Sequence, residues 1–358
     1  MNEIEITNHD RILFIGDVHG DLLPLLGILR HAGVIAIDDC VFDELTACNR
    51  DATRKVDYNV RWDNVARWTG ASTAVVLLGD LLDNKRDLQM STTDRMYGVC
   101  ALPSTQVRIL HILWTLSKDA MCEGGRVVWI LGNHCISNMQ NTQSSMYAPS
   151  VFSENKSIVQ STTTGAWSML VTLYTIRLSA VPVLLLLRHG KPIALALHGL
   201  LHPKFVRMLR LSTIDTGASL HCQLQHIRNN IALINAAYAL KYDMCHLHDD
   251  ARTVNVHSCK SKYWPSHCRS TSRTFTYSAT TACFNVIYVF KGHENKFYNR
   301  HNNTTECDSL SVKAKNIRVY FLDTHMSRCF HDIPNKTQMY HYVQMQPTLE
   351  VQTVNFGI

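Results

Sequence analysis

The chain contains five short phrases in which an apolar run is followed at once by acidic, amide or imidazole side chains. Side chains of these kinds bind divalent metal ions. Because each apolar run is typical of a buried strand, we expect each phrase to deliver its polar side chains at the end of a strand. Strand ends that meet at one point would form a centre for two metal ions. The phrases are RILFIGDVHGD (11–21), AVVLLGDLLDNKRD (74–87), RVVWILGNHC (126–135), PIALALHGLL (192–201) and NVIYVFKGHE (285–294).

The expected metal ligands fall into two groups. Asp17 and His19 are two residues apart, so in an extended segment their side chains point the same way and suit a first ion. Asp80 directly follows a strand and suits a position that bridges both ions. Manganese, iron (Fe²⁺ or Fe³⁺) and zinc all accept mixed oxygen and nitrogen ligands, so we expect two ions from this group. The second ion would be completed by an amide oxygen and two imidazoles, from Asn133, His198 and His293.

Such a centre predicts the hydrolysis of a phosphate ester. Two cations about 3.5–4 Å apart turn a bridging water into hydroxide and stabilise the entering and leaving oxygens of an in-line displacement. His134 is suited to protonate the leaving oxygen, and Asp83 to hold the other nitrogen of that ring. A charged phosphate also needs polar side chains to bind it.

Alternating strands and helices must position these residues. Apolar periodicity predicts helices at 22–33, 106–121 and 165–178 and a mostly helical segment at 203–242. A strand-rich final third predicts an α/β domain in which one sheet packs on another. Strands are predicted at 12–15, 73–78 and 127–131, in a hairpin formed by 181–187 and 193–197, and at 284–290, 317–322 and 340–354.

The phrases span most of the chain, which favours one catalytic domain over residues 1–335. We expect insertions in it at about 38–69 and 243–280, and we assign 336–358 to a C-terminal strand or tail of the same domain. The second insertion is rich in histidine and cysteine, but its spacings match no standard zinc finger, so a polar loop is favoured over a zinc site.

Composition narrows the class of protein. The chain has 46% hydrophobic and 18% charged residues and a formal charge of +6, without a dense basic run, so we expect no nucleic-acid partner. The longest apolar stretch, 181–187, is too short to span a bilayer. The polar N-terminus does not resemble a secretion signal, and we expect an intracellular, cytoplasmic protein whose twelve cysteines are reduced and buried. Cys135 is expected to be a packed thiol, because a metal-hydroxide mechanism needs no cysteine nucleophile.

The order GDVHGD, GDLLDN, GNHC, HGLL, GHE resembles that of the calcineurin-like metallophosphoesterase superfamily, whose pattern is GDxHG, GDxxDRG, GNH(E/D), HGG and GH. The chain looks most like its protein serine/threonine phosphatase type, in particular the Shewanella-like branch, from about residue 10 to 325. The resemblance implies a metallophosphoesterase-type β-sandwich of two mixed sheets flanked by α-helices, with a dinuclear site at the strand C-terminal ends. Matched motif by motif, it implies the same ligand and catalytic roles as those assigned above. The resemblance also implies the side chains that contact the phosphate, which are Arg86, Asn133 and Arg269.

Three positions depart from the family pattern. Asn84 stands where the family has a phosphate-binding arginine, Cys135 replaces an acid, and Leu200 replaces a glycine. The six expected ligands are all present, so we expect an active serine/threonine protein phosphatase whose substrate is a phosphorylated protein or a small phosphoester. Two alternatives remain open: a hydrolase of nucleotides or dinucleoside polyphosphates, and a degenerate phosphatase that binds metal and a partner without turnover. The oligomeric state is not predicted.

Overall fold

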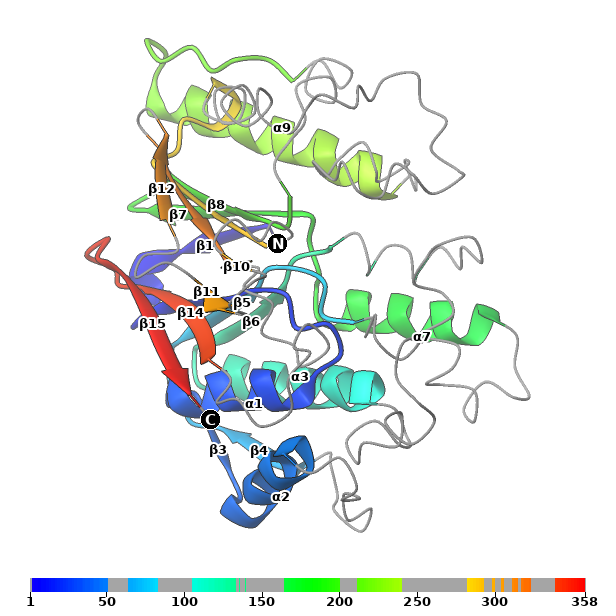
Figure 1. Ribbon diagram of the computed structural model, residues 1–358. Helices are drawn as coiled ribbons and strands as arrows, with labels where there is room; N and C mark the ends of the chain where they lie inside the picture. The colour runs from blue at the N-terminus through cyan, green and yellow to red at the C-terminus, as the bar shows by residue number, and fades with distance from the viewer. Residues whose placement is uncertain are drawn as a thin grey trace.

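Two β-sheets form the centre of the computed structural model, and each contains both parallel and antiparallel pairs (Figure 1). The larger has the order β1-β7-β8-β9-β13-β12, with bounds Glu3–Glu5, Val183–Arg188, Lys191–Leu197, Tyr288–Lys291, Ile317–Phe321 and Ser311–Ala314. The smaller has the order β15-β14-β2-β5-β6, with bounds Val351–Gly357, Met339–Met345, Ile12–Ile15, Ala74–Leu77 and Arg126–Trp129.

The structure describes residues 2–50, 64–82, 105–132, 135, 139, 164–199, 211–239, 282–292, 298–299, 304–305, 311–314, 317–322 and 339–357. The helices within these ranges are α1 (Leu22–His31), α2 (Asp39–Arg50), α3 (Thr105–Cys122), α7 (Thr164–Arg177), α9 (Leu220–Ala239) and the 3-10 turn η1 (Ile6–Asn8). Two further strand pairs are β3 (Ile35–Ile37) with β4 (Ala66–Trp68), and β10 (Tyr298–Asn299) with β11 (Thr304–Thr305).

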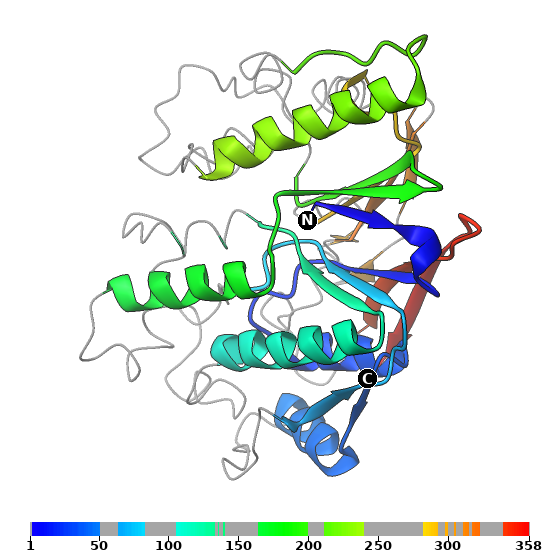
Figure 2. The same cartoon turned by 180° about the vertical axis from the view of Figure 1, so that it is seen from behind.

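The two sheets pack face to face, and helices cover their outer faces (Figures 1 and 2). The apolar cluster between the sheets includes Phe14 of β2 and Phe290 of β9, whose rings stack with centroids 3.7 Å apart. Helices α1 and α3 contact the smaller sheet, and α9 contacts β7 and β8 of the larger one. The expected β-sandwich of two mixed sheets flanked by helices is therefore confirmed.

Some local predictions differ from the structure. The helix expected over 203–242 begins only at Leu220, since the described residues before it, 211–219, are not helical. The strand expected at 284–290 begins at Tyr288, after a helical turn at 282–284. The sequence does not predict strand β1. Its sequence, EIE, lies in a polar stretch, and it pairs in parallel with the apolar strand β7.

The topology brings one pair of strand ends from each sheet to the same edge. In the smaller sheet β2 and β5 are parallel neighbours, with Ile15 opposite Leu77. In the larger sheet β8 and β9 are parallel neighbours, with Leu197 opposite Lys291. The carboxyl ends of parallel strands meet at one edge, so the residues that follow these four strands face a common space between the sheets.

Candidate metal centre

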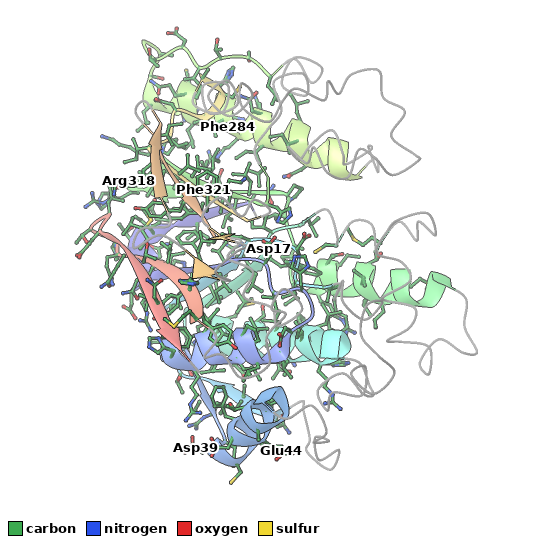
Figure 3. All side chains as sticks on the ribbon, in the orientation of Figure 1. Asp17, Asp39, Glu44, Phe284, Arg318 and Phe321 are labelled. Atoms are coloured by element: carbon green, nitrogen blue, oxygen red, sulfur yellow. The ribbon has the colours of Figure 1, made fainter. Side chains whose placement is uncertain are left out.

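Three of the predicted ligands meet at this edge, two from one sheet and one from the other. Asp17 follows β2, Asp80 follows β5 and His198 directly follows β8. Figure 3 shows Asp17 where the strands of the smaller sheet end. All three residues are buried, with exposures of 1%, 2% and 0%, respectively. Residues separated by up to 181 positions, from 17 to 198, thus form one polar cluster inside an apolar framework.

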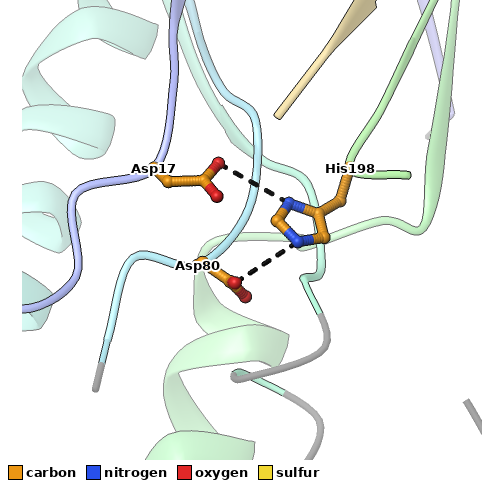
Figure 4. A group of neighbouring side chains, drawn as sticks. All are labelled: Asp17, Asp80 and His198. Carbon is orange, nitrogen blue, oxygen red and sulfur yellow. Dashed lines mark ion pairs between the residues drawn. The ribbon is translucent and has the colours of Figure 1, made fainter. Parts of the chain in front are cut away.

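The spacing within this cluster suits metal coordination. One ligand atom from each of Asp17, Asp80 and His198 can be chosen so that all lie within 4.8 Å of one another. The His198 Nδ1 atom lies 3.7 Å from Asp17 Oδ1, and its Nε2 atom lies 3.3 Å from Asp80 Oδ2 (Figure 4). The imidazole therefore stands between two carboxylates that approach it from the opposite sheet.

A backbone hydrogen bond orients the His198 ring. Its Nδ1–H group donates to the carbonyl oxygen of Leu78 at 2.8 Å, which leaves Nε2 as the ring nitrogen directed at Asp80. Burial alone lowers the pKa of His198, but the negative charges of Asp80 and Asp17 and the hydrogen bonds to Asp80 and Leu78 outweigh it and raise the pKa to about 9. The surroundings of this side chain thus strongly favour a positive charge at its position.

The backbone around the cluster is held in unusual conformations. His19 has φ 49° and Asp80 has φ 30°, both in the left-handed region that side chains other than glycine rarely adopt. The Asp80 carbonyl accepts hydrogen bonds from the amides of His19, at 2.8 Å, and Val18, at 3.2 Å. The His19 side chain is buried, and its Nε2 lies 3.9 Å from Asp17 Oδ2. Local strain of this kind is concentrated at functional sites, where the surrounding fold must maintain it.

Glycines give the ligands room, and sequence reasoning missed this role. A Cβ atom on Gly292 would lie 2.2 Å from Asp17 Oδ1, and one on Gly132 would lie 2.2 Å from Asp80 Oδ1. A Cβ on Gly79 would lie 2.2 Å from His198 Nδ1. The sequence carries a signal for this role, since a glycine precedes the polar residue in four of the five phrases, but a glycine at a strand end by itself predicts only a turn.

Cys135 is packed beside the cluster rather than exposed to substrate. It is fully buried, and burial together with the negative charge of Asp80 raises the pKa of its thiol to about 12, despite backbone hydrogen bonds from Gly132, Leu81 and Leu82. A thiol with so high a pKa is a poor nucleophile at neutral pH. The packed, inert thiol expected at this position is therefore supported.

The cysteines of the described segments are free, but the expectation that they are buried is only partly right. Cys135 and Cys283 are buried, whereas Cys40, Cys122 and Cys222 are exposed. The exposed three lie on outer faces or ends of helices α2, α3 and α9, where apolar packing does not reach them.

Across the described segments, every helix is too short or too polar to cross a bilayer.

Several predicted site residues lie outside the described residues, and their positions stay predictions. The histidine- and cysteine-rich segment 243–280 lies outside them too, as do the family departures Asn84 and Leu200. The predicted site residues concerned are Asp83, Arg86, Asn133, His134, Arg269 and His293.

Comparison with known proteins supports the resemblance. No family model matches the chain. A curated relative, Shewanella-like protein phosphatase 2 of Arabidopsis thaliana, is 28% identical over 142 residues, which is 39% of this chain and 25% of that protein. The chain thus spans about a quarter of the length of this relative.

Among solved structures, a cold-active protein-tyrosine phosphatase of a psychrophilic Shewanella species matches with a TM-score of 0.50 and 13% identity, over 99% of this chain and 82% of that one. A mutant of a cold-active protein tyrosine phosphatase matches with the same TM-score and 14% identity, over the same shares. These structures establish the fold, and the curated relative establishes the sequence likeness. The chain therefore has the sandwich fold of the metallophosphoesterase-type phosphatases and resembles, in sequence, the Shewanella-like branch of the protein phosphatases.

Proposed function

We propose that the protein is a metal-dependent phosphoester hydrolase that removes phosphate from phosphoserine or phosphothreonine in proteins. The observation that supports this proposal most directly is the convergence of Asp17, Asp80 and His198 from two sheets within ligand distance of one another. The likeness to a protein phosphatase in sequence points in the same direction. The finer roles given below extend from these residues to their partners in the same phrases.

The cluster fits a divalent cation on chemical grounds. Two buried carboxylates repel each other, and removing such charges from water is costly unless a cation compensates them. The oriented Nε2 of His198 and the oxygens of Asp17 and Asp80 form a mixed nitrogen and oxygen donor set. Donor sets of this composition suit manganese, iron and zinc.

Each residue then has a defined task. Asp17 and His19 would hold one ion, Asp80 would bridge, and Asn133, His198 and His293 would hold the second. Bound ions of this kind acidify water and neutralise charge on a phosphate. His134 would donate the proton that the leaving oxygen needs, with Asp83 fixing its ring, and Arg86, Asn133 and Arg269 would orient the phosphate.

The first test is hydrolysis of p-nitrophenyl phosphate with added Mn²⁺ by the full chain and by Asp80→Asn. We expect the variant to lose about 100-fold or more, because metal ions supply several kcal/mol of transition-state stabilisation and about 1.4 kcal/mol corresponds to a factor of ten. Asp39→Asn is the matched control. Asp39 lies on α2, well away from Asp17 in Figure 3, and pairs with Arg30 at 2.5 Å on the surface.

Metal content, measured by plasma mass spectrometry on the same three proteins, separates metal binding from turnover. The Asp39→Asn variant should retain the wild-type metal-to-protein ratio, and Asp80→Asn should fall below it. Activity equal in all three proteins would contradict the proposed role of the cluster. Full metal content without activity in the wild type would instead favour the degenerate phosphatase.

Substrate class needs a second experiment. A panel of phosphoserine, phosphothreonine and phosphotyrosine peptides should be compared with diadenosine polyphosphate by kcat/KM. Phosphotyrosine belongs in the panel because the matching solved structures are named as tyrosine phosphatases. Preference for phosphoserine and phosphothreonine peptides is expected, and a preference for the dinucleotide by orders of magnitude would replace this proposal with the nucleotide hydrolase.

The extent of the catalytic unit is part of the proposal. We assign residues 1–335 to one metallophosphoesterase domain and 336–358 to its C-terminal segment, which contributes β14 and β15 to the smaller sheet. Deletion of 336–358 is therefore expected to prevent folding of the smaller sheet rather than to release an independent tail.

A further inference from the structure

Helix α7 carries apolar side chains on two opposite faces, and only one of these faces is covered. Val171 and Tyr174 are buried, with exposures of 0% and 1%, in an apolar cluster that also includes the inner face of α3. Met169, Leu173 and Ile176 are exposed by 74%, 41% and 71%. Their spacing of four and then three residues places them in one stripe along the helix. Helices that are apolar all round are normally buried on all sides, so this stripe is suited to contact another molecule.

Positive charge borders the stripe on the side that faces α3. The Arg177 guanidinium lies 5.7 Å from the ring centroid of Trp114 and 5.3 Å from that of Tyr174. The Lys118 ammonium lies 5.5 Å from the same Trp114 ring. Two cations therefore flank one indole, at the end of α7 that carries Leu173 and Ile176.

Among the described residues, no acidic side chain pairs with these two cations. Neither Lys118 nor Arg177 forms an ion pair with any residue that the structure describes, and both are exposed. Cation–π contacts hold the two side chains in place, and a carboxylate can still bind the Lys118 ammonium and the Arg177 N–H groups that Tyr174 does not engage. The same surface thus offers an apolar stripe and a positive margin.

We propose that this surface, formed by Met169, Leu173, Ile176, Lys118 and Arg177, binds an acidic, amphipathic segment of a partner protein. Apolar side chains of the segment would cover the stripe on α7, and its carboxylates would meet Lys118 and Arg177. Charge complementarity favours this occupant over a second copy of the chain. In a symmetric contact between two copies, Lys118 and Arg177 of one copy would face the same cations of the other and repel them. Binding here does not depend on whether the neighbouring cluster hydrolyses phosphate.

The surface lies on the same side of the two sheets as the strand ends that carry the candidate metal centre. Helix α7 extends away from the sheets beyond the strand ends that carry Asp17 (Figures 1 to 3). Its last residue, Arg177, is followed closely by Val181, which bridges to Ile130 just beyond β6. A protein bound to α7 would therefore lie on the same side of the sheets as the candidate metal centre.

The test is selection of a random peptide library displayed on phage against the full-length protein, followed by affinity measurement on the enriched peptides. We expect enriched sequences to combine acidic residues with Leu, Ile or Phe. Ile176→Ser and Lys118→Glu should each weaken binding by about tenfold or more, as central contacts of an interface do. Leu233→Ser on α9 is the matched control, because Leu233 is exposed to 43%, close to the 41% of Leu173.

Each outcome decides the proposal. Enriched peptides without acidic residues, or binding that Ile176→Ser and Lys118→Glu leave unchanged, would overturn it, as would a library that yields no binder. Sedimentation that shows a dimer lost in Ile176→Ser would assign the stripe to a second copy instead. Hydrolysis of p-nitrophenyl phosphate should stay at the wild-type rate in Ile176→Ser, which separates failure of docking from failure of catalysis.

Discussion

At the scale of single residues, the candidate metal centre requires glycines beside its ligands, because a Cβ atom at these positions would collide with the ligand side chains. Gly292 lies so close to Asp17 that even a methyl group would collide with the carboxylate, at 2.2 Å, and would also approach the Leu78 carbonyl at 2.8 Å. Contacts this short with backbone cannot be relieved by rotating a flexible side chain. The position of the Asp17 carboxylate is thus limited partly by the backbone of the larger sheet, at Gly292.

Gly292→Ala should therefore weaken metal binding by at least about tenfold, since a ligand displaced by the new methyl group loses part of its interaction with the ion. Isothermal titration of the chelator-treated protein with Mn²⁺ measures this effect. Gly217→Ala is the control, because its new Cβ would meet only the flexible Asp215 carboxylate at 3.3 Å. Wild-type Mn²⁺ affinity in Gly292→Ala would show instead that the strand ends can move apart to admit the methyl group without any loss of metal binding.

At the scale of elements, β1 forms one edge of the larger sheet although two of its three residues are charged. Ile4 points into the apolar layer between the sheets and is 2% exposed. The Arg126 guanidinium donates a hydrogen bond to the carbonyl oxygen of Glu3 at 2.8 Å, and Arg228 pairs with the Glu3 carboxylate at 2.7 Å. The strand is thus tied to β6 in the other sheet and to α9.

Ile4→Ala should lower the free energy of unfolding by about 2–5 kcal/mol, the usual cost of removing a buried isoleucine side chain. Chemical denaturation measures this change. Ile287→Ala serves as the reference, since Ile287 is 44% exposed and should cost less than about 1 kcal/mol. Equal costs at the two positions would mean that β1 contributes little to the sandwich.

The elements that sequence could predict are those whose signal is local. Strands such as β2 and β5 are apolar runs ended by Gly-Asp, and the sequence predicts their bounds to within one residue. By contrast, β1 owes its burial to β7, a neighbour about 180 residues away. The clearance provided by Gly292 and the second apolar face of α7 also depend on tertiary contacts, which no short window of sequence contains. For the same reason the phrases suggested the ligands, but not their distances.

At the scale of the whole molecule, a bound ion would link the two sheets. Asp17 and Asp80 extend from the smaller sheet, and His198 extends from the larger one. A ligand that binds only the folded state stabilises it by mass action, by about 2.7 kcal/mol at a concentration of 100 Kd. Since its ligands come from both sheets, the ion would stabilise the sandwich as a unit.

Removal of metal with a chelator should accordingly lower Tm by about 5 °C or more for a chain of this size. Differential scanning calorimetry, with Mn²⁺ restored in a second scan, measures the shift. Asp80→Asn should show no shift, and Asp39→Asn should show the full one. A Tm that does not respond to metal in the wild type would argue against coordination across both sheets.

The stacked rings of Phe14 and Phe290 have a consequence for the choice of ion. They pack between the sheets, on β2, which leads to Asp17, and on β9, the neighbour of the strand that leads to His198, so a change in their packing would change how far the His198 imidazole lies from the carboxylates. Ions of different radius need different ligand separations. The preference of the proposed centre for one ion over another would therefore depend partly on the apolar residues between the sheets, and substitutions there would change it while every ligand stayed the same.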